Sequence, residues 1–253
     1  MNRKAMQRSA GMFAAIALLA GCGDAGEAAP AASSTAASAS ANTPAAEPDL
    51  AACKPSETAD EDYRERKAPI PVPPAFDGLV RSDMDHFAVS TANGHTICVD
   101  TGWMEGIEDA KASHDQRFLS FAWGGYEAFG FIVVDRSGLG QVIETGTAPL
   151  SPPGGMRFAS VDLSESAFGG FNAFGVWQIE PVGLRPLAKV EEGMPSGDWR
   201  LEGWAGDGCV NLSVIPNDRY PSDAGLVDIT TRDPWHATEA EKWALKPGAC
   251  PKP

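Results

Sequence analysis

The chain has 253 residues and a formal net charge of −14 at pH 7. This excess of carboxylates repels phosphate groups, which argues against nucleic acid as a partner and against anionic headgroups as a docking surface. The content of glycine (27), proline (20) and tryptophan (seven) favours a fold rich in strands and turns.

The first feature in chain order is a basic start, followed by an apolar run over residues 11–20 and the sequence Leu19-Ala20-Gly21-Cys22. A run of about ten residues is too short for a permanent transmembrane helix, which needs about twenty. The segment resembles the signal of bacterial lipoproteins, in which a peptidase cuts before a cysteine whose thiol has been acylated. An ordinary secretory signal or a short buried helix is the alternative interpretation.

The resemblance implies that Cys22 is lipidated and that this anchor attaches the protein to a membrane. Two or more acyl chains give stable attachment, whereas a single chain binds only marginally. Gly23 follows the cysteine, at the position where inner-membrane lipoproteins often carry aspartate. The expected location is therefore the bacterial cell envelope, at the outer membrane and facing the periplasm.

The sequence divides into a signal peptide at 1–21, the acylated cysteine with a linker at 22–52, and a single domain at 53–253. The linker consists mainly of Ala, Ser, Thr and Pro and has almost no large apolar side chain, so it cannot bury enough surface to offset its ordering entropy. About thirty such residues have a reach of about 30 Å. The domain is long enough to bury a hydrophobic core.

Two short sequences in the domain occur twice and in the same order. Gly-Gly-Tyr-Glu-Ala-Phe-Gly at 124–130 recurs as Gly-Gly-Phe-Asn-Ala-Phe-Gly at 169–175, and Arg-Phe-Leu-Ser at 117–120 recurs as Arg-Phe-Ala-Ser at 157–160. The difference in spacing indicates an insertion in the second copy at about 164–168. The matches predict a duplicated structural unit.

Each copy of this unit is predicted to contain three strands, because runs of Phe, Val, Ile and Trp lie between glycine and proline residues. The predicted strands are 118–123, 129–135 and 141–145 in the first copy, and 157–163, 174–180 and 184–190 in the second.

A hairpin is predicted on each side of the two copies. The first has strands at 87–90 and 95–100, joined at Asn93-Gly94, a pair typical of type I′ turns. The second has strands at 199–204 and 209–215.

A short helix is predicted over residues 238–246, because Thr238 and Glu241 have the spacing of a capping box.

The turn Ser151-Pro152-Pro153-Gly154 and the strand after it resemble the repeats of WD-like and Tol-type β-propellers, where the turn is Ser-Pro-Asp-Gly. Pro153 replaces the aspartate here. The resemblance implies an all-β fold in which antiparallel hairpin or meander units form a small propeller-like assembly. At about 40 residues per blade the domain has room for only four or five blades, and a β-sandwich built from the repeats is the alternative.

Four cysteines remain in the domain: Cys53, Cys98, Cys209 and Cys250. In an oxidising compartment they predict two disulfides, with three possible pairings. We favour Cys53–Cys250, which would join the two ends of the domain, and Cys98–Cys209, which would join the first and fourth hairpins of a closed ring. The wide spacing argues against zinc, and the sequence predicts no metal or cofactor.

Motifs for catalysis are weak in this sequence. It contains no Gly-x-Ser-x-Gly elbow, no His-Glu-x-x-His and no phosphate-binding loop with lysine. The nearest candidates are Asp83, Asp85 and His86, where a carboxylate beside an imidazole could orient a general base. Consecutive acidic residues before a strand are otherwise typical of a solvated loop.

The aromatic residues give two further expectations. Those of the repeats are predicted mainly to fill the core, although they could also stack on sugars or dock a protein; they are Tyr126, Phe129, Phe171 and Phe174. Three tryptophans outside the repeats are the better candidates for an exposed surface, although a place in the core is favoured for them too; they are Trp103, Trp235 and Trp243.

Together these observations predict a lipid-anchored binding protein of the cell envelope that carries out no catalysis. Its expected partners are the membrane, through the anchor, and an envelope protein or glycan. The alternatives are an envelope hydrolase acting on glycan or peptide, with Asp83, Asp85 and His86 at its site, and a structural spacer between membrane and cell wall.

Overall fold

The computed structural model describes residues 46–55, 66–162, 171–219 and 231–252. The predicted signal, the acylation site Cys22, most of the linker and the insertion near 164–168 lie outside these ranges. Within them, no helix has the length and apolar character needed to cross a bilayer.

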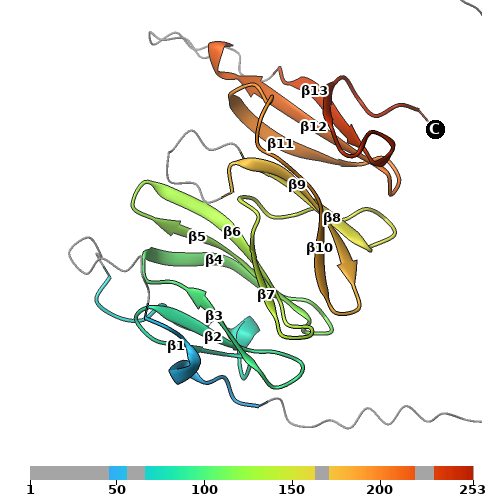
Figure 1. Ribbon diagram of the computed structural model, residues 1–253. Helices are drawn as coiled ribbons and strands as arrows, with labels where there is room; N and C mark the ends of the chain where they lie inside the picture. Colours follow the sequence, from blue (N-terminus) through green and yellow to red (C-terminus); the bar gives the residue numbers. More distant parts are fainter. Residues whose placement is uncertain (1–45, 56–65, 163–170, 220–230, 253) are drawn as a thin grey trace, which may run out of the picture. The chain divides into compact units, whose positions relative to one another are not determined.

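The described residues form four antiparallel sheets, each a meander of consecutive strands (Figure 1). The first sheet has β1 (Val80–Ser82), β2 (His86–Ser90) and β3 (Thr96–Asp100). The second has β4 (Met104–Ala112), β5 (Phe118–Gly125), β6 (Ala128–Asp135) and β7 (Gln141–Glu144). The third has β8 (Arg157–Asp162), β9 (Ala173–Glu180) and β10 (Gly183–Val190). The fourth has β11 (Gly197–Trp204), β12 (Cys209–Pro216), β13 (Asp233–Thr238) and β14 (Leu245–Pro247).

Among the described residues, helical structure is limited to four single turns of 3-10 helix. They are η1 (Leu50–Ala52), η2 (Pro74–Phe76), η3 (Asn217–Arg219) and η4 (Glu239–Glu241). The all-β prediction from repeated meanders is therefore confirmed.

Apolar side chains pack between successive sheets in three clusters. The first cluster joins the first and second sheets, and in it the ring of Phe87 contacts that of Phe121 edge to face. The others join the second sheet to the third and the third to the fourth. The cluster between the second and third sheets has the fewest buried members, and hydrogen bonds also cross that junction, among them those of Arg117, Ser137 and Thr147. Sheets packed face to face are also compatible with the β-sandwich alternative.

Two features of the duplicated sequence are shared by the described residues of both copies. Glu127 and Asn172 occupy equivalent positions before a strand and both have positive φ, 53° and 37°. The equivalent glycines also share a role, because a Cβ at Gly130 or Gly175 would collide with an indole ring. The repeat therefore preserves a left-handed backbone position and a glycine contact.

The favoured disulfide pairing is wrong, although all four cysteines form disulfides as predicted. The bonds are Cys53–Cys98 and Cys209–Cys250, with sequence separations of 45 and 41 residues. Each attaches one end of the domain to its nearest sheet. The prediction assumed that closing a ring brings the first and fourth hairpins together, and no disulfide in the described part of the chain joins those sheets.

Residues before Cys53, assigned to the linker by sequence, contact the first sheet. The Asp49 backbone N–H donates to Thr96 Oγ1 at 3.0 Å, and Pro48 is buried. Contact with the first sheet therefore begins a few residues before the predicted domain boundary.

Two local predictions also need correction. At the β2–β3 connection only Gly94 has positive φ, so the turn is not type I′, which needs two such residues. At 238–246 only η4 is helical, because Lys242 and Trp243 adopt positive φ of 55° and 64°. The tryptophan turns into the third cluster and is 3% exposed.

Candidate functional site: a groove on the second sheet

The central strand of the second sheet carries small side chains on the face turned away from the first sheet. Ala122 lies opposite Phe131 and Gly124 lies opposite Phe129 in the β5–β6 register. Residues directly opposite each other share a face, so the two phenylalanines stand beside a floor of small residues. A Cβ at Gly124 would have no atom within 4 Å, which shows that this floor is open.

The edge strand β4 supplies the opposite wall. Gly106 pairs with Gly124, and Glu108 pairs with Ala122. Glu108 and the following Asp109 are exposed. Carboxylates therefore face aromatic rings across the small residues of β5.

Together these strands enclose a groove of about 610 Å³. Its border is completed by Gly146–Ala148, which leads from β7 toward the third sheet. The charged residues that line it, Glu105, Glu108 and Asp109, are all acidic. The groove thus combines an apolar wall, an acidic wall and a floor almost without side chains.

Exposure of the aromatic residues differs between the two copies of the repeat. Tyr126 and Phe129 are 72% and 54% exposed, whereas their equivalents Phe171 and Phe174 are 5% and 0% exposed. Phe174 packs between the third and fourth sheets. The core prediction is therefore right for the second copy and wrong for the first.

The reason is that the third sheet packs on only one end of this face. Phe118, at the start of β5, packs against the cluster shared with the third sheet. Near the other end of β5, Gly124 pairs with Phe129 of β6, and this phenylalanine remains exposed. The groove lies at this open end.

A hydrogen-bond network fixes the border at Gly146–Ala148. Thr147 Oγ1 donates to the Val161 carbonyl oxygen at 2.9 Å and lies 3.0 Å from Ser160 Oγ. Ser160 Oγ in turn donates to the Thr145 carbonyl oxygen at 2.5 Å. These bonds attach the connection to β8 on this side of the groove.

A carboxyl pair lies next to the network. Burial raises the pKa of Glu144, the negative charge of Asp162 raises it further, and Lys189 acts in the opposite direction. Glu144 Oε1 is buried without a hydrogen-bond partner among the described residues. The fold therefore disfavours the ionised form of this glutamate.

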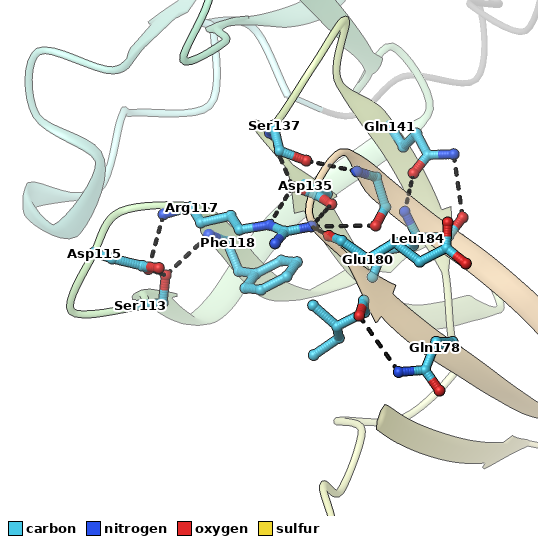
Figure 2. Close-up of polar contacts among 12 residues, drawn as sticks. Ser113, Asp115, Arg117, Phe118, Asp135, Ser137, Gln141, Gln178, Glu180 and Leu184 are labelled. Atoms are coloured by element: carbon cyan, nitrogen blue, oxygen red, sulfur yellow. Dashed lines mark hydrogen bonds and ion pairs between the residues drawn. The ribbon is translucent and has the colours of Figure 1, made fainter. Parts of the chain in front are cut away.

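At the opposite end of β5, Arg117 links the second and third sheets (Figure 2). It donates to both Asp135 carboxylate oxygens, at 3.0 and 2.8 Å, and to the carbonyl oxygens of Glu180 and Gly183, at 2.6 and 3.1 Å. Burial raises the pKa of Asp135, but hydrogen bonds from Arg117 and Ser137 and the charge of Arg117 outweigh it and lower the pKa overall.

The equivalent arginine of the second copy makes the corresponding link to the fourth sheet. Arg157 donates to both carboxylate oxygens of Glu239 at 2.8 Å and to the Asp207 carbonyl oxygen at 3.1 Å. The repeated Arg-Phe-x-Ser thus places an arginine at two successive sheet junctions. Comparing the two copies in the sequence identified this motif. It could not identify the role of the arginine, because that role depends on contacts with the next sheet.

The predicted catalytic candidates lie at the β1–β2 turn and do not line the groove. Asp83 Oδ1 accepts hydrogen bonds from the backbone N–H groups of Asp85 and His86, at 2.8 and 2.7 Å. It also lies 3.3 Å from Nδ1 of His86, which is buried. The structure therefore brings Asp83 and His86 together, and the aspartate caps the turn.

The three tryptophans outside the repeats pack against other indoles. Trp103 contacts Trp123, Trp235 contacts Trp199, and Trp243 contacts Trp204, each edge to face. Trp243 is buried, so the favoured place in the core is confirmed for this residue.

No protein-family model matches the chain, and no curated protein matches its sequence.

Proposed function

We propose that this protein is a lipid-anchored binding protein of the bacterial envelope and that it binds its partner in the groove of the second sheet. The observation that carries the proposal is the contrast between Phe129 and Phe174. The same aromatic position is buried in one copy of the repeat and exposed beside a groove in the other. Exposed aromatic rings beside a concave surface are typical of binding sites.

The location rests on the lipoprotein-like signal and on the cysteines of the domain. Two disulfides suit an oxidising compartment such as the periplasm. An acylated Cys22 would attach the domain to the membrane through the intervening linker and leave the groove accessible to partners in the envelope.

Site-specific photocrosslinking in intact cells tests the binding role. A photoreactive phenylalanine analogue at Phe129 should give a discrete product of higher mass. The same analogue at Leu139, which is 74% exposed in the β6–β7 connection, should not. The binding role is wrong if Phe129 gives no product or if both positions give the same products.

Mass spectrometry tests the anchor separately. Wild-type protein should lack residues 1–21 and carry acyl chains on Cys22, and the Cys22→Ser variant should lose membrane attachment. An unmodified Cys22 in the mature protein would exclude the anchor.

A further inference from the structure

We infer that the groove of the second sheet binds an extended, positively charged polypeptide segment. Its lysine or arginine side chains contact the β4 carboxylates, and its apolar parts contact Phe129 and Phe131. This inference rests on the proposed binding function and adds the chemical class of the ligand.

The charge of the groove selects a cationic ligand. Glu108 and Asp109 are exposed on the β4 wall, and the described residues that line the groove include no lysine or arginine. Glu105 lies on the same strand, where its Oε2 accepts a hydrogen bond from the Arg66 backbone N–H at 3.1 Å. Lys111 follows on the same strand opposite Ser120, beyond the residues that line the groove, and Arg66 and Lys67 line an adjoining hollow that shares Glu105 with it. A cation in the groove gains from these carboxylates and from the face of an exposed aromatic ring.

The shape of the groove favours an elongated occupant. The small residues Ala122 and Gly124 follow β5, between the aromatic wall on β6 and the acidic wall on β4. A trough along a strand accommodates an extended chain, whose alternate side chains point to its two walls. Its volume of about 610 Å³ lies within the range of sites for small ligands and short peptide segments.

The second copy of the repeat shows what covers the equivalent position. There Phe174 is buried in a cluster with Trp199 of β11 and Leu212 of β12. Strands of the same protein therefore cover the ring that corresponds to Phe129. This equivalence favours a polypeptide over a glycan as the occupant of the open groove.

Selection from a library of short random peptides tests the inference with the full chain in detergent. Peptides enriched on the wild-type protein should carry net positive charge. Their affinity should fall by about tenfold or more for Glu108→Lys, Phe129→Ala and Gly124→Val. Gly124→Val fills the floor at a site where no atom lies within 4 Å of the new Cβ, so this variant should fold normally.

Two matched controls separate the groove from general charge and apolar effects. Glu192→Lys makes the same charge change at an exposed site outside the groove, and Leu139→Ala removes an exposed apolar side chain. Both should bind the selected peptides as the wild type does. Binding should also weaken with added salt, because the paired charges are exposed.

Several results would overturn the inference. They are no enrichment, enriched peptides without net positive charge, and equal loss in the controls. Groove-dependent binding of a neutral peptidoglycan glycan fragment, or self-association that Gly124→Val abolishes, would assign the groove to a glycan or to a second copy. A crosslink at Phe129 in cells together with failed peptide binding would overturn the ligand class and leave the binding function standing.

Discussion

Two glycines of the second sheet have opposite surroundings although they lie close together. A Cβ at Gly130 would lie 2.6 Å from the ring of Trp123, whereas a Cβ at Gly124 would meet nothing within 4 Å. Trp123 is 2% exposed and packed in the first cluster, so it has little room to move. One glycine is required by packing, and the other leaves the groove open.

Alanine substitutions should separate these two roles. Gly130→Ala should destabilise the protein by about 1–3 kcal/mol, because the added methyl group overpacks the core. Gly124→Ala should change the free energy of unfolding by no more than about 0.5 kcal/mol. Urea unfolding followed by tryptophan fluorescence measures both, and equal midpoints for the two variants would contradict the packing argument.

Because the fold raises the pKa of Glu144, the free energy of unfolding depends on pH, and the sign of this dependence can be predicted. Its pKa is raised in the fold, first by burial and then by Asp162. The folded state therefore holds this proton more tightly than the unfolded state. The resulting stabilisation is complete below the ordinary glutamate pKa and is lost as pH rises through the raised value.

Glu144→Gln removes this titration. At about pH 7.5 the variant should be more stable than the wild type, and at about pH 4 the difference should disappear. Denaturant unfolding at both pH values measures the effect, with the exposed Glu192→Gln as the control. A variant that is less stable than the wild type at the higher pH would show that the buried carboxylate has a favourable partner.

Between neighbouring sheets, the two repeat-related arginines differ in the burial of the carboxylate that each one pairs with. Arg117 pairs with Asp135, whose side chain is 0% exposed, while Arg157 pairs with Glu239, whose side chain is 55% exposed. Losing the first arginine leaves a buried charge without its partner. Losing the second leaves a carboxylate that water can solvate.

Arg117→Met should therefore destabilise the protein by about 3–5 kcal/mol, and Arg157→Met by about 1 kcal/mol or less. The double variant Arg117→Met/Asp135→Leu should recover part of the first loss, since it removes the unpaired charge. Thermal and urea unfolding provide the comparison. Similar losses for both arginines would mean that exposure of the partner does not determine their contribution.

Sequence periodicity predicted β2, β3 and the strands from β5 to β12, because apolar residues mark each of them. It missed β4, whose residues Glu105, Glu108, Asp109 and Lys111 give it no apolar alternation. This edge strand also contains irregularities in its pairing with β5. The sequence also missed β1, β13 and β14, but among the missed strands β4 is the one that supplies the acidic wall.

The groove itself could be predicted only in part. The repeat identified Tyr126 and Phe129 as notable residues, but sequence alone gave them the same buried role as Phe171 and Phe174. Their different exposure depends on how far the next sheet extends over each copy, and that coverage is a tertiary property. The capping-box signal at Thr238 failed for a similar reason, because burial of Trp243 turns the chain after one helical turn.

For the whole molecule, the disulfides support the two ends of the domain independently. Cys53–Cys98 ties the beginning of the domain to the first sheet, and Cys209–Cys250 ties its end to the fourth. Loops of this length predict a stabilisation of about 2–4 kcal/mol for each bond.

Hydrogen exchange can resolve the two contributions. Replacing Cys209 and Cys250 by alanine should increase exchange in β11–β14 and leave β1–β3 protected, and replacing Cys53 and Cys98 should do the reverse. If either pair of substitutions accelerates exchange equally in all four sheets, the ends are coupled through the whole domain.

The order of the cysteines has a consequence for biosynthesis. In the domain each cysteine bonds to its neighbour along the chain, the first to the second and the third to the fourth. A polypeptide emerging end-first from a translocation pore would thus form the correct linkages simply by oxidising thiols as they appear. Maturation by this route requires an oxidase but no isomerase to reshuffle mispaired sulfurs.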